Sequence, residues 1–187
     1  DDAGEMGNAL TQIDVRTPRT VMQLETGGEH ACAVLDNGRV RCWGNNNHGQ
    51  LGLGDADHRG DAPGEMGDSL PTVDLGTGRT ALQVAIGNQH SCALLDNGGV
   101  KCWGRNDFGQ LGQGHNFDKG DGPNELGDFL PEIALDASYG TVTQIAAGGF
   151  HTCALFDSGN VQCWGVNDQG QLGLGDTESW GDEANEM

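Results

Sequence analysis

One stretch of this chain, from His30 to Gly54, occurs three times, and this repetition limits the possible folds more than any other feature. The copies begin at positions 30, 90 and 151, so the period is 60 and then 61 residues. Each copy has a His two residues before a Cys, a Gly-containing turn, a second Cys ten positions after the first, then Trp-Gly and Gly-Gln-Leu-Gly. A fixed period of this length indicates a repeat array whose units pack against like neighbours.

The whole chain, residues 1–187, is predicted to be one such array. Its units cover approximately residues 1–60, 61–121 and 122–181, and residues 182–187 open a further unit. Residues 1–6 and 182–187 both align with residues 61–66, whereas the end units of a self-contained array usually differ from the inner ones. We therefore expect the array to continue into further copies.

Each unit contains four short runs of apolar residues bounded by Gly, Asp or Asn, which is typical of short β-strands. The runs are residues 11–15, 21–24, 30–35 and 40–43, then 71–76, 81–87, 90–95 and 100–104, then 132–135, 142–146, 151–156 and 161–164. Four strands per unit is the number in a propeller blade. The predicted fold is all-β, with three four-stranded antiparallel blades that are too few to close a propeller, since closure needs about four to eight.

Long Gly- and Asp-rich connections, such as residues 104–130, join the last strand of one unit to the first strand of the next. The Leu of each Gly-Gln-Leu-Gly segment is expected to enter the core. The tail of the connection, residues 124–131, is expected to form one helical turn that ends at Pro131. The three leucines are Leu51, Leu111 and Leu172.

The chain is strongly acidic, with 28 acidic and 9 basic residues and a formal net charge of −19. This charge repels nucleic-acid phosphates, so we expect no nucleic-acid partner. No apolar run approaches the roughly 20 residues needed to cross a bilayer, so we expect no membrane span. Close association of copies would need salt screening, divalent cations, or a strong apolar or hydrogen-bonded contact.

The six cysteines form three pairs with the same spacing. A three-residue hairpin loop with Gly38 in the left-handed conformation would place Cys32 opposite Cys42, within disulfide range. Free thiols and a metal site are the alternatives, although structural zinc needs four ligands and this spacing does not supply them. Disulfides would indicate an extracellular, cell-surface or periplasmic location. The pairs are Cys32 with Cys42, Cys92 with Cys102, and Cys153 with Cys163.

One His and one Trp recur in every unit, and both are expected to be structural. No acid or nucleophile recurs beside the His except Cys, so we expect it to hydrogen-bond a neighbouring turn, and we expect no catalytic residue. The Trp is expected to fill space between adjacent blades, with its indole N–H bonded to a carbonyl. These residues are His30, His90 and His151, and Trp43, Trp103 and Trp164.

Acidic side chains recur in the connection, as Asp61, Glu65 and Asp68 and again as Asp121, Glu125 and Asp128. Carboxylates four and three residues apart on a helical turn would share one face, and oxygen ligands in a Gly-rich loop suit calcium. The simpler interpretation is that these are solvated acids that cap turns. Both interpretations stay open, and calcium is the only cofactor that the sequence suggests.

The repeated pattern Gly-x-x-His-x-Cys-Ala-Leu-x-Asp-x-Gly-x-Val-x-Cys-Trp-Gly-x-Asn-x-x-Gly-Gln-Leu-Gly resembles the repeat of the regulator of chromosome condensation family. The resemblance covers the whole chain in three copies. It implies the family's fold, a seven-bladed propeller of four-stranded blades. The Cys pair is similar to secreted bacterial versions and departs from the nuclear member, whose exchange activity and chromatin contacts do not carry over to these residues.

The sequence thus predicts a non-enzymatic, extracellular structural repeat protein. Its partners would be further copies of itself or adjacent repeats, in a closed propeller or an open fibre. The alternative is a secreted protein-binding propeller module, of the inhibitor or adhesion type, whose variable loops contact another protein.

Overall fold

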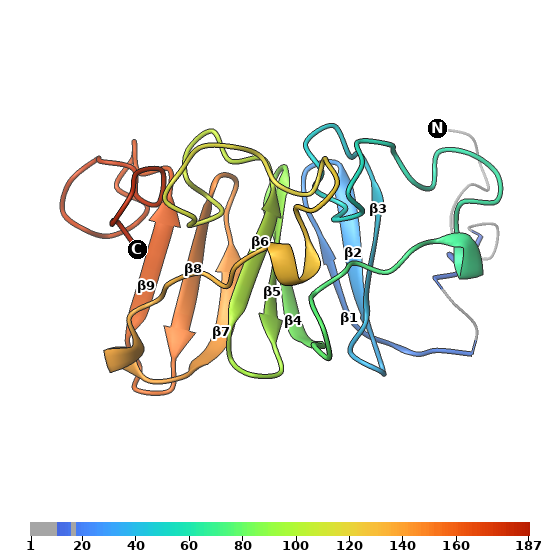
Figure 1. Ribbon diagram of the computed structural model, residues 1–187, viewed down its shortest axis with the longest axis horizontal. Coiled ribbons are helices and arrows are strands. Elements are labelled where there is room, and N and C mark those ends of the chain that lie inside the picture. The colour runs from blue at the N-terminus through green and yellow to red at the C-terminus, as the bar shows by residue number, and fades with distance from the viewer. Residues whose placement is uncertain (1–10, 16–17) are drawn as a thin grey trace, which may run out of the picture.

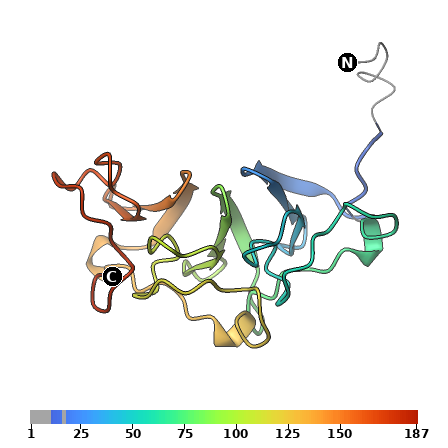
Figure 2. The ribbon, with the colours of Figure 1, turned by 90° about the horizontal axis from the view of Figure 1, so that it is seen from above.

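The computed structural model describes residues 11–15 and 18–187, and in these residues it contains nine strands in three antiparallel sheets that stand side by side (Figures 1 and 2). Sheet 1 consists of β1 (Val21–Thr26), β2 (His30–Leu35) and β3 (Val40–Gly44). Sheet 2 consists of β4 (Ala81–Ile86), β5 (His90–Leu95) and β6 (Val100–Gly104). Sheet 3 consists of β7 (Val142–Ala147), β8 (His151–Phe156) and β9 (Val161–Gly165). The opening segment, residues 1–6, lies outside the described residues.

The register of each hairpin follows from its turn, as predicted. Gly38 has a φ of 71°, which glycine adopts without steric cost, and the Leu35 N–H donates to the Arg39 carbonyl at 2.9 Å. The pairing then runs on so that Val34 faces Val40 and Cys32 faces Cys42. Sheets 2 and 3 repeat the same register, with Cys92 opposite Cys102 and Cys153 opposite Cys163.

The predicted fourth strand was wrong, because each sheet has three strands. The Val73 N–H donates to the Val40 carbonyl at 2.9 Å, so the segment after η2 (Gly67–Ser69) touches the outer edge of sheet 1. The carbonyl of Leu75 instead accepts from the Lys101 ammonium of β6 at 3.0 Å. The segment therefore crosses from one sheet to the next instead of continuing the ladder, and the Pro at position 71 supplies no N–H. Residues 11–15 and 132–135 also lie outside the strands.

The apolar core lies between the sheets. One buried cluster joins Cys32, Val40 and Leu51 of the first unit to Val84 and Trp103 of sheet 2. A second cluster joins sheets 2 and 3 in the same way. Leu51 and Leu111 are fully buried and Leu172 is nearly so, which confirms their predicted place in the core. Each sheet therefore buries the face that meets a neighbouring sheet.

The connections contain single turns of 3-10 helix. η3 (Gly127–Phe129) lies within the predicted helical segment and ends before Pro131, which confirms that prediction. A further 3-10 turn, η4 (Ala137–Tyr139), is capped by Asp136, whose carboxylate accepts from the Ser138 N–H at 2.9 Å. No helix in the described ranges is long and apolar enough to cross a bilayer.

Candidate functional site

The candidate site is the junction between two neighbouring sheets, which occurs twice inside the chain. At the first junction the carbonyl oxygen of Gln50 accepts from the Trp103 indole N–H at 3.1 Å and from the Ser91 hydroxyl at 2.8 Å. At the second, the carbonyl of Gln110 accepts from Trp164 at 3.0 Å and from Thr152 at 3.1 Å. Each Gly-Gln-Leu-Gly turn thus receives two donors from the next sheet. Trp103 and Trp164 are fully buried there, whereas Trp43 is only half-buried.

The buried histidines complete the junctions. His30 Nε2 lies 2.9 Å from the Ser91 hydroxyl oxygen, and His90 Nε2 lies 3.0 Å from the Thr152 hydroxyl oxygen. Because each hydroxyl proton goes to a Gln carbonyl, the imidazole Nε2–H donates to the hydroxyl oxygen. The partner is therefore a strand of the next sheet, where the sequence had suggested a neighbouring turn.

Burial keeps these histidines neutral. It lowers the pKa of His30 to about 4 and that of His90 to about 3, because an imidazolium loses its hydration inside the junction. Burial also lowers the pKa of the half-buried His151. An alanine in place of Gly87 would put its Cβ 2.0 Å from the His90 ring, so the ring fits only against glycine.

A glutamine in the first strand of sheets 1 and 2 forms a second contact with the next sheet. The Gln83 side chain accepts from the Ile145 N–H at 2.9 Å and donates to the Ile145 carbonyl at 2.9 Å. Gln23 makes the same pair of hydrogen bonds to Val84, at 2.9 and 3.0 Å. One side-chain amide thereby satisfies both backbone groups of a residue on the next sheet.

The two ends of the array carry unpaired halves of this junction, and we call them the C-terminal face and the N-terminal face. On the C-terminal face, Gln144 is exposed and His151 is half-buried, and no further sheet of the described chain covers them. On the N-terminal face, Leu24 is 56% exposed, whereas the equivalent Val84 and Ile145 are 0% and 2% exposed. Ala31 stands where the other units have Ser91 and Thr152, so this face lacks the hydroxyl.

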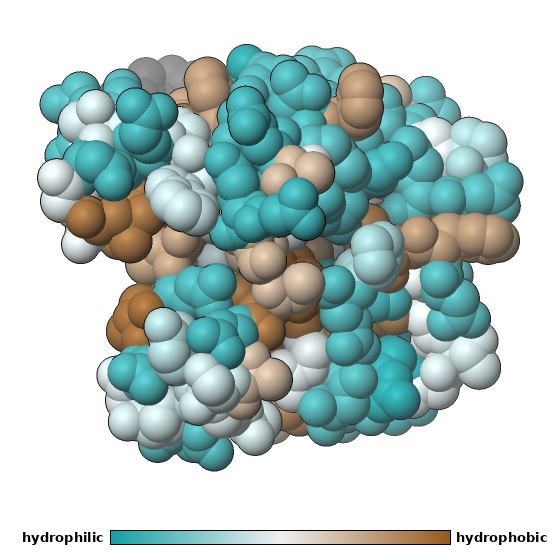
Figure 3. All heavy atoms as spheres, turned by 60° about the vertical axis from the view of Figure 1, so that its left-hand side comes forward, coloured by the Kyte–Doolittle hydropathy of each residue, from teal (hydrophilic) through white to brown (hydrophobic). Residues whose placement is uncertain are grey.

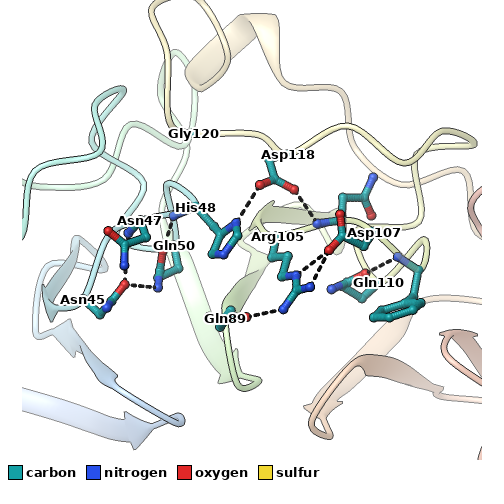
Figure 4. A network of polar contacts seen from close by, with 12 residues as sticks. Asn45, Asn47, His48, Gln50, Gln89, Arg105, Asp107, Gln110, Asp118 and Gly120 are labelled. Atoms are coloured by element: carbon teal, nitrogen blue, oxygen red, sulfur yellow. Dashed lines mark hydrogen bonds and ion pairs between the residues drawn. The ribbon is translucent and has the colours of Figure 1, made fainter.

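The loops above the junctions are joined by residues that differ between units. His48 lies 2.8 Å from the carboxylate of Asp118 in the next unit, and the other oxygen of Asp118 accepts from the Asn106 N–H at 2.8 Å (Figure 4). Arg105 donates to Gln89 at 2.6 Å and lies over the Phe150 ring, 5.6 Å from its centroid. A common scaffold thus carries a surface of varied chemistry.

The three cysteine pairs lie at the centre of the sheets, each bonded across β-strands in register. The S–S distances are 2.07, 2.05 and 2.08 Å, and the described residues contain no free cysteine. Cys32, Cys42, Cys92 and Cys102 are fully buried, so the disulfides form part of the core between sheets.

The acidic residues of the connection have partners in the loop backbone. The Glu65 carboxylate accepts from the N–H groups of Gly60 and Ala62 at 2.8 and 3.0 Å, and these hydrogen bonds lower its pKa. Glu125 accepts in the same way, at 3.1 and 3.0 Å. Asp128 accepts from the Thr77 N–H at 2.8 Å. Over residues 11–15 and 18–187, no group of three His, Cys, Asp or Glu side chains is placed to hold a metal ion. The structure supports turn capping for Glu65 and Glu125, and the calcium interpretation stays a prediction.

Sequence reasoning missed Ser91, Thr152 and the glutamines that join the sheets. A signal was present for the glutamines, because Gln23, Gln83 and Gln144 recur in the middle of an apolar run. A polar residue at one position in every copy of a strand indicates a partner outside that strand. No comparable signal marks position 91, where the three units have Ala, Ser and Thr.

Three like sheets joined face to face define a β-repeat protein whose units depend on their neighbours. Residues 23–50, 82–110 and 142–171 match one description of the regulator of chromosome condensation (RCC1) repeat, and residues 37–94 and 97–155 match a second. The chain belongs to the RCC1 repeat family.

Relatives share the repeats over part of their length. The probable E3 ubiquitin-protein ligase HERC6 of Homo sapiens is 35% identical over an alignment of 179 positions that covers 91% of this chain and 16% of that protein. The ultraviolet-B receptor UVR8 of Arabidopsis thaliana is 31% identical over an alignment of 187 positions that covers 95% of this chain and 38% of that protein. The chain therefore spans well under half of these relatives.

Solved structures show the same fold. Human WBSCR16 aligns with a TM-score of 0.65 and 26% identity, over 86% of this chain and 38% of that one. Prp20p of Saccharomyces cerevisiae aligns with a TM-score of 0.63 and 21% identity, over 85% and 36% of the two chains.

Because burial lowers the pKa values of His30 and His90, we expect the protein to lose stability in mild acid. Their folded pKa values lie below the ordinary value of 6.5, so the unfolded chain takes up protons first as the pH falls. Their contribution is complete above pH ~6.5 and decreases from there toward pH ~4, by up to about 1.4 kcal/mol per pH unit for each His. Urea unfolding between pH 7 and pH 4.5 measures this slope.

His90→Gln removes one titrating group and retains an amide that can donate to Thr152. The slope of unfolding free energy against pH should therefore become shallower in this variant. An unchanged slope would show that His90 is not held neutral in the fold.

Proposed function

We propose that this chain is a non-catalytic structural unit that joins like sheets through its two end faces. The observation that supports the proposal is the repeated junction: two complete copies lie inside the chain, and its two halves lie unpaired at opposite ends. Gln144 and His151 present the groups that Gln83 and His90 use internally. Leu24, which is 56% exposed, is equivalent to Val84 and Ile145, whose N–H and carbonyl groups bond the glutamine of the preceding sheet. The partner is therefore another sheet of the same kind.

Charge opposes this association. With a net charge of −19, two copies repel one another at long range, and salt at ~0.15 M confines that repulsion to about 8 Å. The junction itself consists of apolar contacts and hydrogen bonds between uncharged groups, which salt weakens little. Association should therefore increase with ionic strength, the opposite of association through salt bridges.

The proposal predicts reversible self-association, which sedimentation velocity from low to several hundred micromolar would measure. Gln144→Ala should weaken the association and leave the stability of the chain within about 0.5 kcal/mol of wild type, because Gln144 is exposed. Gln83→Ala is the matched variant inside the chain, and it should lower stability by about 1–3 kcal/mol because it leaves Ile145 backbone groups unpaired.

A chain that stays monomeric at every concentration and salt level would contradict the proposal. So would association that Gln144→Ala leaves unchanged, because the C-terminal face would then take no part.

We further propose an extracellular, cell-surface or periplasmic location, supported by one cross-strand disulfide in every sheet. Thiol alkylation of the denatured natural protein, read by peptide mass analysis, should then leave these six cysteines unmodified before reduction and modify all six after reduction. Labelling of all six cysteines without reduction would contradict this location.

A second function, binding of an unrelated protein, is favoured by the loop surface. Equivalent loop positions carry Asp57, Phe117 and Glu178, and the Phe117 ring is exposed. Among similar structures, yeast RCC1 (Prp20) is seen bound to Kap60, and Prp20p of Saccharomyces cerevisiae binds Gsp1p and histones. Capture of one defined partner by a strictly monomeric chain would favour this function over assembly.

A further inference from the structure

The surface of this chain is mostly hydrophilic and acidic, and one pocket between sheets 1 and 2 contrasts with it. Figure 3 shows hydrophilic residues over most of one face, and acidic residues outnumber basic ones by 28 to 9. The pocket has a volume of ≈ 390 Å³, and its lining includes Arg39, Arg79, Thr72 and Thr80. Two guanidinium groups and two hydroxyls in one pocket are groups that bind an anion.

The walls of the pocket are held together by backbone hydrogen bonds. The segment that crosses to sheet 2, residues 72–80, is attached to sheet 1 on both sides of the pocket. The Val73 N–H donates to the Val40 carbonyl at 2.9 Å, and the Ala81 N–H donates to the Gly38 carbonyl at 2.8 Å. The β2–β3 turn forms one wall and the crossing segment forms the other. All the lining residues therefore lie between positions 38 and 80, within the described chain and away from both end faces.

The backbone and the acids of the crossing segment are already paired. The Asp128 carboxylate accepts from the Thr77 N–H at 2.8 Å, and the Asp74 carboxylate accepts from the Gly76 N–H at 2.9 Å. Asp74 also lies against Gly127 of η3, where an added Cβ would come 2.4 Å from its second oxygen. An anion in the pocket would therefore be bound by the arginine side chains and the hydroxyls.

The two arginines have little compensating charge within the chain. Arg79 lies 3.3 Å from the Asp96 carboxylate, which is long for a charge-assisted hydrogen bond. Arg39 has no carboxylate within ion-pair distance among residues 11–15 and 18–187. Both side chains reach solvent, so a dissolved ligand has access to them.

The second junction has a carboxylate at the equivalent place. Glu132 is equivalent to Thr72, and Gly99 is equivalent to Arg39. The Glu132 carboxylate accepts from the Asn97 side chain at 2.8 Å and lies beside Gly99, where an added Cβ would come 2.3 Å from it. The first junction thus has a guanidinium and a hydroxyl where the second has an anionic group of its own.

We propose that the pocket binds a small dicarboxylate, with Arg39 and Arg79 as its charged ligands and Thr72 as a hydroxyl donor. A guanidinium binds a carboxylate through two parallel hydrogen bonds. The volume is at the low end of the range for ligand pockets, about 300–1,000 Å³, which suits a molecule of a few carbons. This site does not depend on the proposed joining of sheets, because its lining belongs to a single chain.

Titration with glutarate at constant ionic strength, followed by ¹H–¹⁵N NMR, tests the proposal. The amide signals of residues 38–40 and 72–80 should shift and saturate, whereas those of residues 98–100 and 132–140 should not move. Arg39→Gln should weaken binding at least about tenfold, because it removes charge-assisted hydrogen bonds. Arg39→Lys retains the charge without the planar fork and should bind with intermediate affinity. Because Arg39 is exposed, both variants should unfold at the wild-type temperature.

The chain offers a matched control. Arg19 is equivalent to Arg79, pairs with Asp36 at 3.5 Å and does not line the pocket, so Arg19→Gln should leave the glutarate affinity unchanged. Thr72→Glu places a carboxylate of the chain itself in the pocket and should abolish binding. Thr72→Gln has nearly the same shape without the charge and should bind more tightly than Thr72→Glu.

Three results would overturn the proposal. A wild-type chain that shows no saturable shift with glutarate has no such site. An equal loss of affinity in Arg19→Gln and Arg39→Gln would show a general effect of charge instead of a pocket. Inorganic phosphate that binds the wild-type pocket more tightly than glutarate would overturn the assignment of a carboxylate ligand.

Discussion

The structure depends on the burial of apolar side chains between sheets. Each sheet has three short strands, and the two larger core clusters each combine residues of two neighbouring units. Burying a Leu, Val or Trp is worth about 1.5–3 kcal/mol, and the disulfides inside the sheets add a constraint on the unfolded chain. Sheet 2 has both faces covered, whereas sheets 1 and 3 each have one face covered. Stability in such an array comes from nearest-neighbour contacts, so the chain's ends are its least stable parts.

Hydrogen bonds across the junction determine how the sheets fit together. The Gln50 carbonyl, the Ser91 hydroxyl and the His30 imidazole satisfy one another across the interface. An unpaired buried polar group costs about 1–3 kcal/mol, so a shifted or foreign sheet that left these groups unpaired would be rejected. The apolar core thus favours contact between sheets, and the polar groups select a sheet of the same kind in the correct register.

Much of the fold could be predicted from the sequence because it is locally determined. The turn around Gly38 fixes the hairpin register, and that register places Cys32 opposite Cys42. The recurring Leu of each Gly-Gln-Leu-Gly turn is buried as expected. The fourth strand was not predictable, since residues 71–76 have strand-like alternation but their carbonyls accept from the Lys101 side chain of β6 and from the Gly127 N–H of the next unit. Contacts between residues far apart in the chain, such as the pair Leu75 and Lys101 at a separation of 26 positions, decide such cases, and one sequence does not show them. The same reason explains why the His30 partner, Ser91, was missed, since it lies 61 positions away.

Native-state hydrogen exchange at low protein concentration tests the central claim most directly, because it reports local opening free energies strand by strand. If the sheets are stabilised by their neighbours, the amides of β5 in sheet 2 should be the most protected, and those of β2 and β8 should exchange through lower-energy openings. Equal protection of β2, β5 and β8 would contradict this account, because each sheet would then be stable without a neighbour on both faces.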